Sequence, residues 1–122
     1  MTDLEAVAGR QFAHVTTRGR RTGRPHTIEI WFAVSGDRAY VLSGGGDRSD
    51  WVRNLRRDPA VLLRIGDGTW PARARLVEGA AEDRLARELL AAKYQGWREG
   101  RALSRWASTA LPVAIEPAEA SP

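Results

Sequence analysis

The stretch His26-Thr27-Ile28-Glu29-Ile30-Trp31-Phe32-Ala33-Val34 decides the class of fold. Its apolar residues Ile28, Ile30, Phe32 and Val34 recur at every second position, and this period of two is typical of a β-strand. Residues 35–38 then have the composition of a turn, and residues 39–43 are again suited to a strand. The pattern therefore predicts a β-hairpin over residues 26–43.

Short elements are expected on both sides of this hairpin. Further strands are predicted over residues 11–17, 60–65, 69–78 and 111–115, and the turn Gly66-Asp67-Gly68 links two of them. Helices are predicted over residues 2–8, 50–57 and 80–94, with another helical segment within 97–108. Leu85, Leu89 and Ala92 share the expected buried face of the helix over 80–94, with Ala86 and Leu90 beside them.

Strands of this number, mostly linked by hairpins, predict an α+β fold that is mainly β. We expect an antiparallel sheet of about six strands curled into a small barrel, with two to four peripheral helices. The 122 residues suit a single domain. Residues 1–9 are expected to form a short helix or arm, residues 10–116 the barrel, and residues 117–122 a disordered tail.

Composition excludes several classes of protein. The absence of cysteine excludes a disulfide framework, a cysteine nucleophile and cysteine-based metal or iron–sulfur sites. Apolar runs are too short for a membrane anchor, and the first residues lack the pattern of a secretory signal, so we expect a cytoplasmic location. His14 and His26 are the only histidines, and no hydrolase or metal motif is present. The remaining function classes are a binding protein and an enzyme whose chemistry is supplied by an organic cofactor.

The net charge of +4 is concentrated in one part of the chain. Residues 18–24 read Arg-Gly-Arg-Arg-Thr-Gly-Arg, and arginine and glycine together suit a loop that binds an anion. Ser43-Gly44-Gly45-Gly46 leads into the helix over 50–57, which is compatible with a phosphate cradle. Taken separately, the first segment is more simply interpreted as a solvated loop and the second as a flexible connection. The presence of both segments favours one anionic ligand that they share.

Several segments resemble the deazaflavin-dependent nitroreductase family. They are Thr16-Thr17-Arg18-Gly19-Arg20-Arg21-Thr22-Gly23-Arg24-Pro25, Ser43-Gly-Gly-Gly, Trp51-x-x-Asn54-Leu55-x-x-x-Pro59 and Leu111-Pro112-Val113. The resemblance implies a split β-barrel of the flavin-reductase type that binds coenzyme F420. It also implies hydride transfer from the reduced cofactor to an electron-poor small-molecule acceptor, namely a quinone, an enone or a nitroaromatic compound, and a possible homodimer.

The resemblance also implies roles for individual residues. The loop residues would hold the phosphate and acidic tail of the cofactor, and the stretch from Thr27 to Trp31 would run beneath the deazaflavin ring. The glycine run would lie on the phosphate side, and the following helix would close over the cofactor. The implied cofactor-binding residues are Arg20, Arg21, Thr22, His26, Thr27, Ile28, Trp31, Ser43, Gly44, Gly45, Trp51 and Asn54, without a metal. Trp97, or Tyr94 beside it, would line the substrate side as the candidate catalytic position.

Two alternatives remain open. Gly44 and His26 stand where the family commonly has cationic residues, so an oxidoreductase with the same fold that binds FMN is the first alternative. A small basic barrel that binds nucleic acid is the second. The charge-neutral second half of the chain and the lack of aromatic residues interleaved with arginine argue against nucleic acid as a partner.

Overall fold

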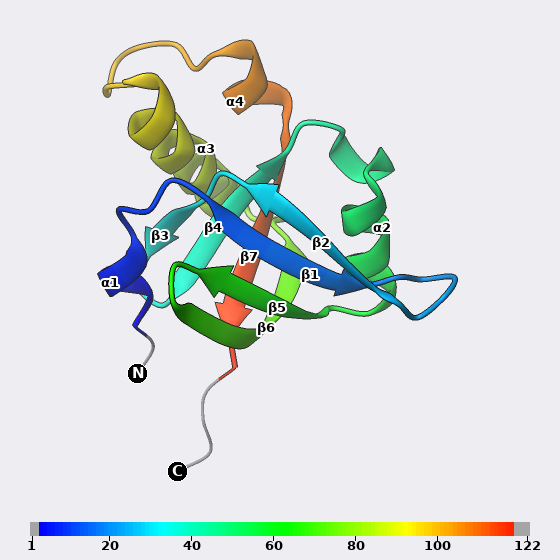
Figure 1. The fold of residues 1–122 in the computed structure, drawn as a ribbon. Helices are drawn as coiled ribbons and strands as arrows, with labels where there is room; N and C mark the ends of the chain where they lie inside the picture. The colour runs from blue at the N-terminus through cyan, green and yellow to red at the C-terminus, as the bar shows by residue number, and fades with distance from the viewer. Residues whose placement is uncertain (1–2, 119–122) are drawn as a thin grey trace.

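Seven antiparallel strands form a single sheet in the order β2-β1-β5-β6-β7-β4-β3 (Figure 1). The computed structural model describes residues 3–118. The elements are α1 (Leu4–Val7), β1 (Ala13–Arg18), β2 (Pro25–Ile30), β3 (Ala33–Ser35), β4 (Arg38–Ser43), the 3₁₀ turn η1 (Gly46–Arg48), α2 (Asp50–Arg57), β5 (Ala60–Ile65), β6 (Gly68–Leu76), α3 (Ala80–Gln95), α4 (Arg105–Thr109) and β7 (Leu111–Pro117). The predicted fold class, mainly β with a few helices, is confirmed.

The sheet curls because its two end strands are consecutive in the chain. β2 and β3 lie at opposite ends of the sheet order, yet only Trp31 and Phe32 separate them. The ends of the sheet must therefore meet at these two residues, which gives the split barrel. The hairpin predicted over residues 26–43 is wrong in its first arm, because β2 pairs with β1 and only Ala33–Ser35 pairs with β4.

The alternation of side chains does not mark this corner, because it continues through it. Ile30 and Phe32 lie with the apolar cluster inside the barrel, whereas Trp31 and Ala33 lie with a second cluster beneath α3. Consecutive side chains of any strand point to opposite faces, so this pattern is compatible with one continuous strand. The corner is held instead by α3, since the backbone N–H and carbonyl of Phe32 bond to Tyr94 and Lys93.

α3 packs over the second cluster on a face rotated slightly from the predicted one, since Leu89 is only partly buried there. Its buried residues are Ala86, Leu90 and Ala91, and the side chain of Leu85 is 39% exposed. Ala86 and Leu90 are four residues apart and so lie on one face of a helix. The helix itself is confirmed over Ala80–Gln95, and it ends at Gly96, whose φ of 66° is in the left-handed region.

The remaining differences lie near the C-terminus. The helical segment predicted within residues 97–108 is reduced to the five residues of α4. β7 extends beyond the predicted strand to Pro117, which lies opposite Ala72 on β6. Residues 1–2 and 119–122, which belong to the predicted arm and tail, lie outside the described residues. No helix in the described part of the chain has the length and apolar character needed to cross a membrane.

Candidate active site

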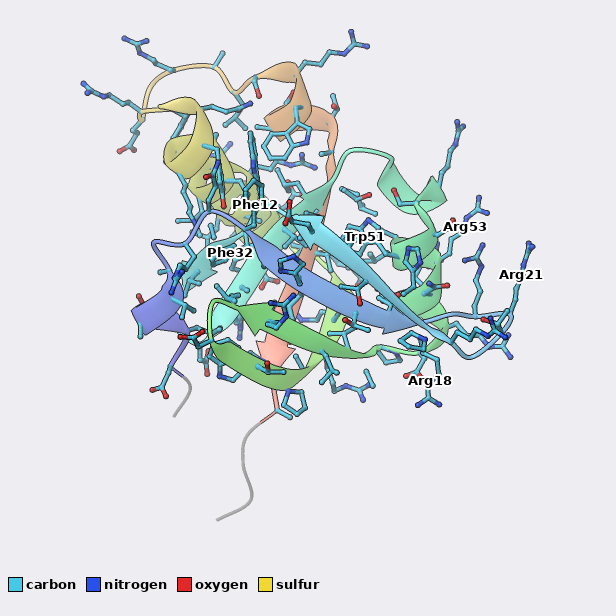
Figure 2. All side chains as sticks on the ribbon, viewed as in Figure 1. Phe12, Arg18, Arg21, Phe32, Trp51 and Arg53 are labelled. Atoms are coloured by element: carbon cyan, nitrogen blue, oxygen red, sulfur yellow. The ribbon has the colours of Figure 1, made fainter. Side chains whose placement is uncertain are left out.

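Two neighbouring cavities lie along β2 and α2. The larger, of about 550 Å³, we call the aromatic cavity; it is lined by Phe12, Glu29, Ile30, Trp31, Leu42, Ser43, Gly44, Ser49, Trp51, Gln95 and Trp106. The smaller, of about 310 Å³, we call the arginine cavity; it is lined by Gly19, Arg20, Arg21, Thr22, Arg24, Pro25, His26, Asp50 and Asn54. Figure 2 shows Trp51 near the middle of the molecule and Arg21 at the far end of the β1–β2 hairpin.

The first turn of α2 lies between the two cavities. Trp51 lines the aromatic cavity, whereas Asp50 and Asn54 line the arginine cavity. β2 also contributes to both, through Ile30 at one end and His26 at the other. These two side chains lie on the same face of β2, because the side-chain period of a strand is two. The two cavities therefore lie along the same strand and the same helix, and we call this region between β2 and α2 the groove.

Asn54 holds the loop over residues 18–24, which we call the arginine loop, against α2. Its side chain is buried, and its Oδ1 accepts hydrogen bonds from the backbone N–H of Arg20 at 3.1 Å and from Nη1 of Arg20 at 2.9 Å. Its Nδ2 donates to the buried hydroxyl of Thr17 at 3.1 Å. Nη2 of Arg20 also lies 3.2 Å from Oδ1 of Asp50. The hydrogen bonds of Arg20 to Asn54 and its ion pair with Asp50 therefore serve mainly to fix the loop.

The loop is further closed by its own backbone. The N–H of Gly19 donates to the carbonyl of Arg24 at 2.7 Å, and the N–H of Gly23 donates to the carbonyl of Gly19 at 2.8 Å. Gly23 has a φ of 73°, which favours glycine. The side chains of Arg21 and Arg24 are exposed and form no ion pair within residues 3–118. They remain available to an anionic ligand.

The glycine run lies at the aromatic cavity. Oγ of Ser43 donates to the carbonyl of Gly46 at 2.9 Å and lies 3.0 Å from Oγ of Ser49. A Cβ atom on Gly45 would overlap Oγ of Ser49, and Gly46 has a φ of 62°. The run is therefore required to close this turn, and Gly44 is its member that lines the cavity.

The corner between β2 and β3 is held by the end of α3. The hydroxyl of Tyr94 accepts a hydrogen bond from the N–H of Phe32 at 3.0 Å and lies 2.7 Å from the carbonyl oxygen of Gln11. Nζ of Lys93 donates to the carbonyl of Phe32 at 2.9 Å and lies 3.7 Å from the centre of its ring. Burial lowers the pKa of Lys93 to about 8 and raises the pKa of Tyr94, so the phenol stays protonated at neutral pH.

This anchoring orients Trp31 as a wall of the aromatic cavity. The rings of Trp31 and Tyr94 are stacked, with centroids 4.3 Å apart and an angle of 2° between their planes. Trp106 on α4 meets Trp31 edge-on at 5.5 Å. Such packing fixes the orientation of the indoles and leaves an aromatic surface that suits a planar ligand.

The sequence profile of the F420H(2)-dependent quinone reductase family matches residues 2–117. The chain belongs to this family. It is therefore an F420-dependent reductase, and the family resemblance stated from the sequence motifs is confirmed. No curated protein has a sequence that matches this reductase significantly.

Solved structures with similar folds support the split barrel. A conserved hypothetical protein from Mycobacterium tuberculosis is 21% identical, with 98% of this chain and 82% of that chain covered and a TM-score of 0.82. An FAD-binding protein from Mesorhizobium loti is 17% identical, with 98% and 91% covered and a TM-score of 0.65. An F420-H2 dependent reductase is 24% identical, with 88% and 94% covered and a TM-score of 0.64.

Most of the predicted site residues of the reductase meet along the groove. Trp31, Ser43, Gly44 and Trp51 line the aromatic cavity, and Arg20, Arg21, Thr22, His26 and Asn54 line the arginine cavity. Thr27 lies on the other face of β2, where its hydroxyl is 2.7 Å from that of Thr16, and Ile28 packs against the core. Gly45 lines neither cavity.

The two candidates for the substrate side lie elsewhere. Tyr94 stacks against Trp31 without lining either cavity of the groove. Trp97 lines a different cavity beside α3, together with Arg87, and its indole N–H donates to the carbonyl of Arg101 at 2.8 Å. The structure does not bring Trp97 to the groove.

The implied cofactor-binding residues do not include the remaining residues of the aromatic cavity, although Glu29 and Ile30 lie in the stretch over residues 27–31 that the resemblance places beneath the ring. These remaining residues are Phe12, Glu29, Ile30, Leu42, Ser49, Gln95 and Trp106. Ile30 could have been found, because it is two residues from Ile28 on the same face of a predicted strand. Trp106 and Gln95 carry no local signal, because they reach the cavity through the docking of α3 and α4. Within the described residues, no group of three potential metal ligands is present.

Proposed function

We propose that the protein transfers a hydride from reduced coenzyme F420 to an electron-poor organic acceptor, a quinone, an enone or a nitroaromatic compound, with the cofactor lying along the groove between β2 and α2. The observation that carries the proposal is that the aromatic and arginine cavities lie next to each other along β2 and α2. Both are lined by residues of the same strand and the same helix. A ligand with an apolar planar end and an anionic end would match the aromatic cavity with the first end and the arginine cavity with the second.

The arginine cavity suits the anionic part of the cofactor, its phosphodiester and glutamates. Arg21 and Arg24 are exposed, and Arg53 on α2 is also exposed and lies on the same side of the molecule (Figure 2). Guanidinium groups bind phosphate and carboxylate through charge-assisted hydrogen bonds. Asn54 supports this role from behind, since it fixes the loop that carries Arg21.

The aromatic cavity suits the planar ring and the acceptor. Trp51 is buried on α2, and Trp31 and Trp106 provide further flat surfaces. When bound, the reduced deazaflavin supplies the hydride. The protein residues then have three tasks: they hold two planar molecules in contact, exclude water from between them and fix their relative orientation. None of these tasks requires a general acid or base.

Titration with candidate ligands tests the proposal. Purified protein is titrated with oxidised F420, with FMN and with a single-stranded oligonucleotide, and tryptophan fluorescence is followed. We expect F420 to bind most tightly, and Arg21→Ala to weaken its binding by about 10-fold or more, the value of one charge-assisted hydrogen bond. Arg73→Ala is the matched control, because Arg73 is an exposed residue of β6 outside the groove.

Two results would contradict the proposal. Tight binding of the oligonucleotide without binding of F420 would favour the nucleic-acid alternative, and tighter binding of FMN than of F420 would favour the FMN alternative. The cytoplasmic location and the homodimer remain predictions. Sedimentation equilibrium at micromolar protein concentration tests the homodimer.

A further inference from the structure

The polar side chains at the aromatic cavity differ in the hydrogen bonds that they can still form. The hydroxyls of Ser43 and Ser49 bond each other and the glycine turn. The carboxylate of Glu29 can only accept, and it lies 3.2 Å from Nε2 of His14. Side-chain N–H groups at this cavity come from the indoles of Trp31, Trp51 and Trp106, with one each, and from the carboxamide of Gln95, with two.

Gln95 is held in one orientation by α4. Ser104 is the N-cap of α4, and its Oγ accepts a hydrogen bond from the N–H of Ala107 at 3.1 Å. The hydroxyl of Ser104 in turn donates a hydrogen bond to Oε1 of Gln95 at 2.7 Å. With its carbonyl oxygen bound to Ser104, the carboxamide keeps its two N–H donors for another partner.

We propose that the carboxamide nitrogen of Gln95 donates a hydrogen bond to an oxygen of the electron acceptor, and that Gln95, positioned by Ser104, sets the preference for acceptors that carry a carbonyl or nitro oxygen. This inference rests on the proposed function, since it names the polar contact of the same cavity. Gln95 is a specificity-determining residue, and Ser104 is a positioning residue.

The chemistry of the acceptor explains why a donor is useful here. A quinone or nitro compound that gains a hydride accumulates negative charge on its oxygens, and a fixed N–H donor stabilises that charge. The proton that finally joins the oxygen comes from water, because an amide is not a proton source at neutral pH. An acceptor without oxygen gains nothing from Gln95.

Equilibrium dialysis of the cofactor-free protein tests the contact directly. The probes are 1,4-naphthoquinone and naphthalene, which share a ring skeleton and differ in two oxygens. Gln95→Met keeps the length of the side chain and removes its donor. We expect this variant to bind naphthoquinone about five- to tenfold more weakly than the wild type and to bind naphthalene with unchanged affinity. Equal changes for both probes, no change for either, or no binding of naphthoquinone to the wild type would overturn the inference.

Further variants separate the donor from its support. Gln95→Glu still accepts the hydrogen bond from Ser104 but has no N–H group, so it should lose naphthoquinone affinity at least as strongly as Gln95→Met. Ser104→Ala keeps the donor and frees its orientation, so a smaller loss of about threefold is expected. Wild-type affinity for naphthoquinone in Gln95→Glu would contradict the donor role. Thermal melting of each variant verifies that it is folded.

Turnover distinguishes failure of this inference from failure of the proposed function. If the wild type does not oxidise reduced F420 with any acceptor, the proposed function fails, while the dialysis still decides the role of Gln95. If the wild type turns over 1,4-naphthoquinone, we expect Gln95→Met to raise KM and to lower kcat, because the hydrogen bond strengthens as the acceptor gains charge. A kcat/KM equal to that of the wild type would overturn the inference alone.

Discussion

Replacement of Asn54 by alanine should both destabilise the protein and release the arginine loop. The variant loses three hydrogen bonds, two to Arg20 and one to Thr17. The side chain of Arg20 is 22% exposed, so water replaces its bond at little cost. Thr17 is only 1% exposed, and without Asn54 its hydroxyl keeps only a long hydrogen bond of 3.5 Å to the carbonyl of His26. A buried polar group that is poorly satisfied costs about 1–3 kcal/mol, and the lost backbone bond adds about 1 kcal/mol.

The expected total is a loss of about 3 kcal/mol in the free energy of unfolding. For 122 residues, this corresponds to a decrease of about 10 °C in Tm. Equilibrium unfolding in urea, followed by tryptophan fluorescence, measures the change. Affinity for F420 should fall as well, because Arg21 is no longer held beside α2.

Two matched variants test the role assigned to Asn54. Asn54→Asp keeps the shape and the oxygen that accepts from Arg20, and the hydroxyl of Thr17 can turn to donate to it, so stability should stay within about 1 kcal/mol of the wild type. Arg53→Ala changes the exposed neighbour on α2 and should leave stability within about 0.5 kcal/mol. If Asn54→Ala is as stable as Arg53→Ala, the assigned role of Asn54 is wrong.

Two further predictions concern the aromatic cavity and its supports, and a third concerns the carboxylate of Glu82 on α3. Trp106→Ala should weaken binding of F420 or of the acceptor by about fivefold or more, because Trp106 lines the aromatic cavity, whereas Trp97→Ala should leave both affinities unchanged in the same titrations. Tyr94→Phe should lower the free energy of unfolding by about 1–3 kcal/mol in urea, because the N–H of Phe32 loses its acceptor. Hydrogen bonds from Arg75 and Tyr40 lower the pKa of Glu82 to about 2, so the stability that this carboxylate provides is present above its unfolded pKa of about 4.5 and is lost as the pH falls towards 2. Glu82→Gln should flatten that part of the curve of stability against pH; an unchanged slope would contradict the assignment.

The sequence predicts local features of this protein well. The short apolar run over residues 60–65 and the Gly66-Asp67-Gly68 turn predict the β5–β6 hairpin, because both signals are contained within one short segment. The loop over residues 18–24 and α2 are also at the expected positions. Two of the predicted ligand residues, Arg20 and Asn54, prove to bond each other. Their side chains differ in type and are 34 residues apart, so a local pattern could not show that they support the loop together.

Long-range pairing could not be predicted in the same way. The alternation over residues 26–34 indicates a strand, but it does not indicate that the strand divides between the two ends of the sheet. That division depends on Lys93 and Tyr94 of α3, which bond the backbone of Phe32 at the corner. Trp106 and Gln95 reach the aromatic cavity only after these contacts form. The family resemblance implies that Trp97 or Tyr94 lines the substrate side, but a position near a helix end does not specify the face that a side chain occupies.

The claim that one groove binds both ends of the cofactor is tested most directly by comparing two deazaflavins. Oxidised F420 carries the phosphodiester and glutamates, whereas the deazariboflavin core has the same ring without them. Titration of both into the wild-type protein, followed by tryptophan fluorescence, gives two dissociation constants. We predict that F420 binds about 100-fold more tightly, since at least two charge-assisted hydrogen bonds from the arginine loop are lost with the tail. Equal dissociation constants for the two ligands would contradict the claim.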